Sequence, residues 1–169
     1  MLDIKIKNKF YNQTNILKDI ELNIKNSEFI SIIGASGCGK TSLLRMISSL
    51  DEDYDGKISY KNGKSIDNLG YIFQDSRLLP WLNVMDNILL VSKNKDEKYI
   101  HELLDEVGLS EYKFAYIKEL SGGMKRRVSI VRAFVNNPEV LLLDEPFISL
   151  DYPTAKSLRE LLFKLYKEF

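Results

Sequence analysis

The residues best suited to chemistry lie in the run GASGCGKT at 34–41, which has the spacing G-x-x-x-x-G-K-[ST]. Glycines let backbone N–H groups converge on phosphate oxygens, and a helix that begins at the end of the run adds a favourable dipole. Lys40 would reach the β- and γ-phosphates of a nucleotide, and the Thr41 hydroxyl would bind Mg²⁺. A chance match in a chain of this length has a probability under ~1% at typical residue frequencies. We therefore interpret this run as a nucleotide phosphate site.

Two acidic residues follow the apolar run at 140–143. A carboxylate at the C-terminal end of a buried strand can hold Mg²⁺ through its water shell, and we assign this role to Asp144. Glu145 would point toward the γ-phosphate and polarise an attacking water. The alternative is an acidic turn in which Glu145 is merely solvated. Beside a phosphate-binding loop, the catalytic interpretation is favoured.

A second phosphate-binding helix start is predicted by the run LSGGM at 120–124, which stands directly before a helical pattern. Its N–H groups and the Ser121 hydroxyl suit an anion. One chain has no obvious need of two such sites for one nucleotide, unless two copies face each other.

With these motifs in this order, the chain resembles the nucleotide-binding subunit of ATP-binding-cassette (ABC) transporters over essentially its whole length. In that family the LSGG motif closes over the γ-phosphate bound by the opposite subunit. The resemblance therefore implies that Ser121 and Gly123 act in trans. Met124 stands where the family usually has glutamine, a change that leaves the serine and glycine contacts intact.

Three further matches extend the resemblance. Gln74, at the end of a predicted strand, matches the Q-loop glutamine, whose amide can bind Mg²⁺ or the attacking water and whose loop meets the membrane partner. The run at 149–151 (Ser149, Leu150 and Asp151) matches the D-loop, although alone it could equally cap a helix. Tyr11 lies where the family places an aromatic ring that stacks on adenine; packing is the alternative.

The resemblance implies ATP and Mg²⁺ as ligands and a set of site residues. The nucleotide contacts would be Tyr11, Gly34, Ala35, Ser36, Gly37, Cys38, Gly39, Lys40, Thr41 and Ser42 of one copy, with Ser121, Gly122 and Gly123 of the other. The catalytic residues would be Glu145, Lys40 and Gln74, and Mg²⁺ would be held by Thr41, Gln74 and, through water, Asp144. We interpret Cys38 as a small residue of the loop with no redox role.

The elements that must position these residues alternate between strands and helices. Apolar residues alternate along 2–6 and 20–24, which predicts half-buried strands. The run FISII at 29–33 predicts a central buried strand that feeds the phosphate loop. Further predicted elements are helices over 41–50, 96–107 and 122–137, strands over 58–60, 70–73 and 140–143, a polar turn at 61–64 and a final helix.

This order predicts an α/β fold whose core is that of a P-loop NTPase with a mainly parallel sheet. The resemblance adds an N-terminal antiparallel β subdomain and an inserted helical subdomain. We expect a single ABC ATPase domain over 1–169. Residues 1–75 and 138–169 would form the β subdomain and core, and residues 76–137 would hold the Q-loop, the helical subdomain and the signature motif.

Composition excludes several other classes. The 24 basic side chains balance 24 acidic ones, so no overall field attracts nucleic acid, and we expect none as a partner. A single cysteine excludes a disulfide framework and suits a reducing compartment, and a single histidine, His101, excludes His-pair zinc chemistry within the chain. No apolar run approaches the ~20 residues that span a bilayer. We expect a cytoplasmic protein, peripheral on the inner face of the membrane.

The segment LLPWL at 78–82 looks like a stretch found in importer ATPases for nitrate, sulfonate, taurine and related small compounds. Its Pro-Trp pair would present an apolar ridge to a permease helix, or else plug the helical subdomain onto the core. By family spacing a switch histidine would fall beyond Phe169, and His101 cannot replace it because it precedes the signature motif. We therefore expect a shortened cassette whose hydrolysis is in question.

The predicted function is that of the ATP-hydrolysing subunit of a small-solute importer. Its partners would be a second ATP-binding subunit, in a homodimer, the transmembrane permease subunits and, indirectly, an extracytoplasmic solute-binding protein. One alternative is a soluble ABC ATPase of DNA repair or translation. Another is a nucleotide-dependent interaction module without turnover. A P-loop kinase explains neither the LSGG nor the D-loop match.

Overall fold

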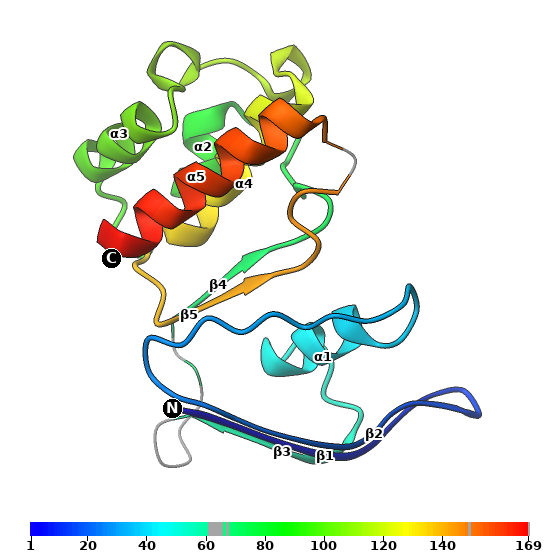
Figure 1. The fold of residues 1–169 in the computed structure, drawn as a ribbon. Helices are drawn as coiled ribbons and strands as arrows, with labels where there is room; N and C mark the ends of the chain where they lie inside the picture. Colours follow the sequence, from blue (N-terminus) through cyan, green and yellow to red (C-terminus); the bar gives the residue numbers. More distant parts are fainter. Residues whose placement is uncertain (61–65, 67, 149, 169) are drawn as a thin grey trace. The chain divides into compact units, whose positions relative to one another are not determined.

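A computed structural model of the chain describes residues 1–60, 66, 68–148 and 150–168 and divides into two units, Met1–Asp67 and Asn68–Phe169 (Figure 1). The turn predicted at 61–64 and Ser149 of the D-loop match lie outside the described residues. Within those residues, no helix is both long and apolar enough to cross a membrane.

The first unit is built on an antiparallel sheet with the strand order β2-β1-β3. The strands are β1 (Leu2–Tyr11), β2 (Thr14–Ile24) and β3 (Asp55–Tyr60). The alternation read from the sequence is confirmed, because Leu2, Ile4 and Ile6 are buried along β1 while the residues between them are more exposed. The antiparallel N-terminal sheet is thereby confirmed as well.

Helix α1 (Lys40–Ile47) completes the first unit and begins directly after the glycine-rich loop. It buries its apolar side chains Leu43, Leu44, Met46 and Ile47. The predicted helix over 41–50 is confirmed in place but is too long, because the helix is capped at Ser48 and Ser49 takes a left-handed conformation with φ 56°.

The buried strand predicted over 29–33 is wrong. The structure assigns these residues to no strand, and the side chains of Phe29 and Ile33 are 64% and 92% exposed. A buried strand requires a ladder with neighbouring strands and a covered face. The strands of the first unit pair with one another in the order β2-β1-β3, and the run is not among them. Apolar composition alone does not supply such partners.

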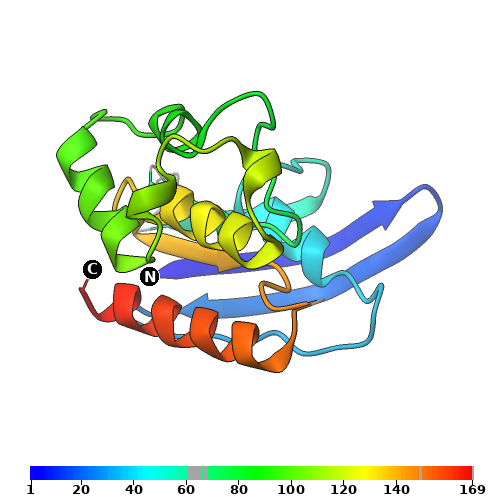
Figure 2. The same ribbon diagram turned by 90° about the horizontal axis from the view of Figure 1, so that it is seen from above.

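The second unit contains a parallel pair of strands, β4 (Leu69–Ile72) and β5 (Val140–Leu143). Its helices are α2 (Val84–Leu89), α3 (Glu97–Glu106), α4 (Gly122–Phe134) and α5 (Tyr152–Glu168), with 3₁₀ turns η1 (Ser110–Tyr112) and η2 (Ile117–Glu119). Helix α4 contacts β4, α2, α3 and α5, and Figure 2 shows α5 running beside it. Helix α4 is therefore the central element of the second unit.

Local signals in the sequence account for the bounds of α3. Asp96 caps its start by accepting a hydrogen bond from the Tyr99 N–H at 3.1 Å, and Gly108, with φ 66°, ends it. Its apolar side chains Ile100, Leu103 and Leu104 are buried, as the predicted helical period requires. Helix α4 ends at Phe134, three residues before the predicted Asn137, which has a left-handed φ of 49° and precedes Pro138.

Candidate nucleotide-binding site

The glycine-rich loop of the first unit has the backbone conformation that its composition predicts. Gly37 and Gly39 have φ angles of 78° and 95°, in the left-handed region that other residues adopt at a cost. Gly39 is the N-cap of α1, and among the described residues no side chain makes a capping hydrogen bond at this helix start. A Cβ atom built on Gly37 would meet nothing within 4 Å, so the loop borders open space there. These features fit a bound polyphosphate.

Lys40 places a positive charge against the same loop. Its ammonium donates to the carbonyls of Gly34 and Ala35, at 3.0 Å in each case. The side chain therefore folds back from the first residue of α1 to the first residues of the loop. A cation held beside glycine N–H groups is the arrangement that binds β- and γ-phosphates. Thr41 follows in the first turn and is exposed, and Cys38 is a free, exposed thiol.

Tyr11 ends β1 with a half-exposed ring. Its hydroxyl donates to Asp51 Oδ2 at 3.2 Å, and Lys9 Nζ lies 4.9 Å from the ring centroid. The ring is thus held from its hydroxyl end and remains 46% accessible to solvent. This geometry is compatible with stacking on a base, and the adenine contact stays a prediction.

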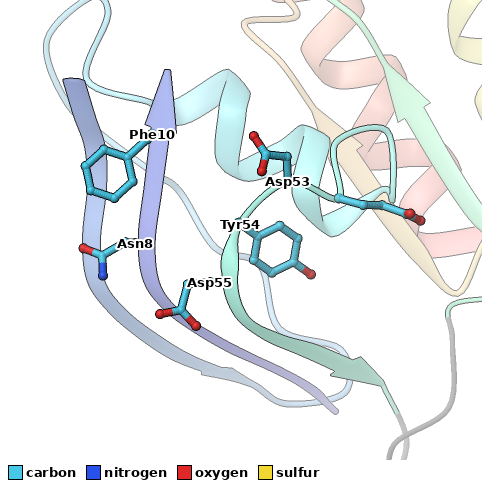
Figure 3. A pocket seen from close by; sticks show the side chains of 6 residues that line it. Asn8, Phe10, Asp53, Tyr54 and Asp55 are labelled. Atoms are coloured by element: carbon cyan, nitrogen blue, oxygen red, sulfur yellow. The ribbon is translucent and has the colours of Figure 1, made fainter. Parts of the chain in front are cut away.

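A depression in the described part of the first unit is not suited to phosphate. It has a volume of about 440 Å³ and is lined by Asn8, Phe10, Glu52, Asp53, Tyr54 and Asp55. Figure 3 shows Asp53 and Asp55 with the polar side chain of Asn8 around it. Its three carboxylates would repel a polyphosphate. The depression is therefore a poor candidate for the phosphates, and their binding at the loop stays a prediction.

In the second unit, the acidic pair lies at the end of β5, as predicted. The Asp144 N–H donates to the Ile72 carbonyl at 2.9 Å, which continues the β4–β5 ladder by one bond. The Asp144 side chain is buried, and its Oδ2 accepts a hydrogen bond from the Tyr71 hydroxyl at 3.4 Å. Glu145 turns the chain away from the strand with a left-handed φ of 45°.

Gln74 lies at the same edge of the parallel pair. The register pairs Ile72 with Leu143, so the chain leaves both strands together, toward Gln74 on one side and Asp144 on the other. Gln74 is exposed, while its backbone carbonyl is held by Arg126 at 3.2 Å. The structure thus brings Gln74 and the acidic pair to one edge, where their amide and carboxylate oxygens are the ligand types that Mg²⁺ prefers.

Helix α4 begins at the LSGGM run, and the start of the helix is exposed to solvent. Ser121 is the N-cap, and its Oγ accepts a hydrogen bond from the Met124 N–H at 3.2 Å. Ser121 and Gly122 are exposed, and a Cβ on Gly122 would meet nothing within 4 Å. Gly123 is more crowded, since a Cβ there would lie 3.3 Å from Thr154 Cγ2. An exposed helix start of this kind is accessible to an anion.

The structure bears on two motif matches for which the sequence left an alternative open, the D-loop match and the 78–82 segment. Asp151 accepts a hydrogen bond from the Thr154 N–H at 3.1 Å, so the capping interpretation of this residue is confirmed, and its D-loop role stays a prediction. In the 78–82 segment, Leu78 packs on the core while Trp81 is 69% exposed. The segment therefore both packs on the core and presents an aromatic side chain outward.

The predicted site residues are divided between the two units. Tyr11 and residues 34–42 belong to the first, and Gln74, residues 121–123, Asp144 and Glu145 belong to the second. Sequence reasoning missed Lys9 and Asp51, which support Tyr11, and Arg126, which binds the Gln74 backbone. The sequence shows Lys9 only as a lysine near the end of a strand in which apolar and polar residues alternate. A charged side chain at such a position is usually exposed.

Comparisons with known proteins agree with this geometry. The family model described as "ABC transporter" matches residues 17–148. The aliphatic sulfonates import ATP-binding proteins SsuB of Bacillus licheniformis and Bacillus subtilis are 42% and 44% identical, over 99% and 98% of this chain and 69% of each relative. Two dimeric structures of the bacterial ABC transporter cassette MJ0796, one bound to ADP and phosphate, are each 32% identical, with TM-scores of 0.83 and 0.85 over 99% of this chain and 84% of theirs. The chain is an ATP-binding domain of the ABC transporter family.

Proposed function

We propose that this chain is the ATP-hydrolysing subunit of an importer for small organic solutes of the sulfonate type. The observation that carries the proposal is that Gln74, Asp144 and Glu145 all follow the same end of the parallel pair β4–β5. The same chain also contains the phosphate loop with Lys40. The solute class is supported by the two aliphatic sulfonates import ATP-binding proteins, which are 42% and 44% identical to this chain.

The chain's own residues have distinct tasks in this reaction. The 34–39 loop and Lys40 bind the phosphates of ATP, and Tyr11 stacks on its adenine. Glu145 accepts a proton from a water whose oxygen bonds to the γ-phosphorus. The bond from that phosphorus to the β–γ bridging oxygen breaks, and ADP and phosphate are released.

The donor set of the chain also fits a hard divalent cation. Thr41, Gln74 and Asp144 offer hydroxyl, amide and carboxylate oxygens, and the buried Asp144 has a fixed position. Bound Mg²⁺ would supply neutralisation of the β- and γ-phosphate charge. Among these groups, we assign Thr41 and Gln74 direct contacts and Asp144 a contact through water.

The exposed start of α4 supports a dimer in which Ser121, Gly122 and Gly123 of one copy face the nucleotide of the other. The related MJ0796 cassette structures are dimeric. The exposed Trp81 is the side chain we assign to the membrane permease, beneath which the dimer would lie on the inner face of the membrane. A solute-binding protein outside the cell would act through that permease.

Phosphate release from the chain with MgATP tests the reaction. The Glu145→Gln variant should bind ATP as the parent does and release phosphate at a rate lower by about 100-fold or more, since only the proton acceptor is lost. Lys40→Ala should lose nucleotide binding. Equal phosphate release by the parent and by Glu145→Gln would contradict the assignment of Glu145.

The solute class has a separate test. The chain is produced in a bacterium that lacks the ATP-binding subunit of its own sulfonate importer, with an aliphatic sulfonate as the sole sulfur source. Growth that is lost in the Glu145→Gln variant would support the proposal. Absence of growth, with phosphate release intact, would leave the ATPase and remove the sulfonate assignment.

A further inference from the structure

Arg126 lies in the second turn of α4 with its guanidinium directed into the protein. The residue is only 6% exposed. Its Nε donates to the Pro146 carbonyl at 2.7 Å, and its Nη1 donates to the carbonyls of Phe73 and, at 3.2 Å, Gln74. One side chain therefore binds three backbone carbonyls from two separate segments of the chain.

Both segments carry residues of the proposed reaction. Gln74 is the second residue after β4, and Pro146 directly follows Glu145 after β5. Arg126 itself is five residues beyond Ser121, the N-cap of α4. The guanidinium thus links α4 to the Gln74 backbone and to the turn that carries Glu145, all within the second unit.

The position is demanding for a charged side chain. Burial lowers the pKa of Arg126, and the nearby Asp75 carboxylate partly offsets this. Its guanidinium donates hydrogen bonds to three backbone carbonyl oxygens. A planar fork can satisfy several carbonyls at once, whereas a lysine ammonium is a compact donor on a flexible stem. Partly buried carbonyls that lose this donor would favour rearrangement of the two segments.

A second arginine holds the far end of the Gln74 segment on the same helix. Arg132 Nη1 donates to the Arg77 carbonyl at 2.8 Å. The Arg77 guanidinium in turn lies 3.9 Å from the centroid of the Phe73 ring. Residues 73–77 are therefore attached to α4 at both ends, with Arg126 at the end that carries Gln74.

We infer that Arg126 is a positioning residue for ATP hydrolysis. It holds the Gln74 backbone and the turn after Glu145 in fixed relation to the start of α4, so a displacement of that helix start moves both. The inference rests on the proposed function. It assigns Arg126 no contact with ATP, so its loss should lower the rate of hydrolysis and spare nucleotide binding.

The test compares Arg126→Lys with Arg127→Lys. Arg127 is the matched control because its guanidinium donates elsewhere, to the Val107 carbonyl at 2.8 Å and to Ser157 Oγ at 3.3 Å. We expect kcat of Arg126→Lys to fall about tenfold or more, with Kd for MgATP within about twofold of the parent, because misplacement of reacting groups acts on the chemical step. Arg127→Lys should keep both values. Equal kcat in the two variants would overturn the inference.

A second readout does not depend on turnover. Backbone amide exchange is measured for peptides covering 73–77 and 146–148. The peptides of Arg126→Lys should exchange faster in both segments than those of Arg127→Lys. Should the parent show no hydrolysis, the proposed function fails, and this comparison still decides whether Arg126 holds the two segments. Unchanged exchange in both would reject that role. If Arg126→Lys does not fold, Arg126→Gln takes its place.

Discussion

Lys9 Nζ lies 2.8 Å from Asp51 Oδ1, although the Lys9 side chain is only 2% exposed. The same ammonium donates to the Asp53 carbonyl at 2.5 Å, and the Tyr11 hydroxyl donates to the other Asp51 oxygen at 3.2 Å. The pair therefore ties β1 to the chain that follows α1. It also fixes the ring that we propose stacks on adenine.

Breaking this pair from one side should destabilise the protein. Asp51→Asn leaves the buried Lys9 ammonium without its main counter-charge, and we expect the free energy of unfolding to fall by about 2–3 kcal/mol. The double variant Lys9→Met/Asp51→Asn removes both charges and should recover most of that loss. Urea unfolding followed by circular dichroism measures the three proteins. An Asp51→Asn variant as stable as the parent would show that the pair contributes nothing.

The pair should also affect stability in acid. The hydrogen bond from Lys9 lowers the pKa of Asp51 in the folded state, against a smaller opposing effect of burial. A lowered folded pKa gives stability that is present above the unfolded value of about 3.9 and is lost as the pH falls through the folded pKa. The difference in free energy of unfolding between the parent and the double variant should therefore be constant from about pH 5 to 8. Below about pH 4 the parent should lose stability relative to the double variant. A difference that does not change in acid would contradict this.

The sequence predicted those features that depend on neighbours along the chain. The period of Ile100, Leu103 and Leu104, with Asp96 before and Gly108 after, is sufficient to define α3. The buried strand expected at 29–33 failed because strand formation depends on partners far away in the sequence. Arg126 was missed for the same reason. Its acceptors at Phe73 and Pro146 are remote in sequence, and an arginine after a helix start is usually solvated.

The two left-handed glycines of the phosphate loop should differ when each is changed to alanine. A Cβ on Gly39 would lie 2.8 Å from Leu17 Cδ2, so Gly39→Ala adds a steric clash to the cost of its φ angle of 95°. A Cβ on Gly37, at φ 78°, meets nothing within 4 Å. We expect a loss of unfolding free energy of about 1 kcal/mol for Gly37→Ala and about 2–3 kcal/mol for Gly39→Ala.

Nucleotide affinity provides a second test of the phosphate loop. The methyl group of Gly37→Ala would occupy the open space beside the loop, where we propose the phosphates bind. This variant should fold and yet bind MgATP at least about tenfold more weakly than the parent. Thermal unfolding without nucleotide and titration with a fluorescent ATP analogue give the two quantities. Gly37→Ala binding at parental strength would place the phosphates elsewhere.

Asn87 should control the position of Trp81. Its amide is fully buried; the Oδ1 accepts from the Leu79 N–H at 2.8 Å, and the Nδ2 donates to the carbonyls of Leu79 and Leu82 at 3.1 and 3.3 Å. Asn87→Leu removes the acceptor of the Leu79 N–H and one hydrogen bond to each of the Leu79 and Leu82 carbonyls, on both sides of Trp81. We expect unfolding free energy to fall by about 2–3 kcal/mol and acrylamide quenching of Trp81 to change.

The neighbouring cap of α2 provides the control for that experiment. The Asn83 side chain accepts from the Asp86 N–H at 2.8 Å, so Asn83→Ala should cost about 1 kcal/mol through the helix end. It should leave Trp81 quenching as in the parent, because it removes no bond to the Leu79 or Leu82 backbone. If the proposed permease contact depends on Trp81, Asn87→Leu should impair sulfonate-dependent growth while MgATP binding is retained. Unaltered Trp81 quenching in Asn87→Leu would show that other contacts set the position of this segment.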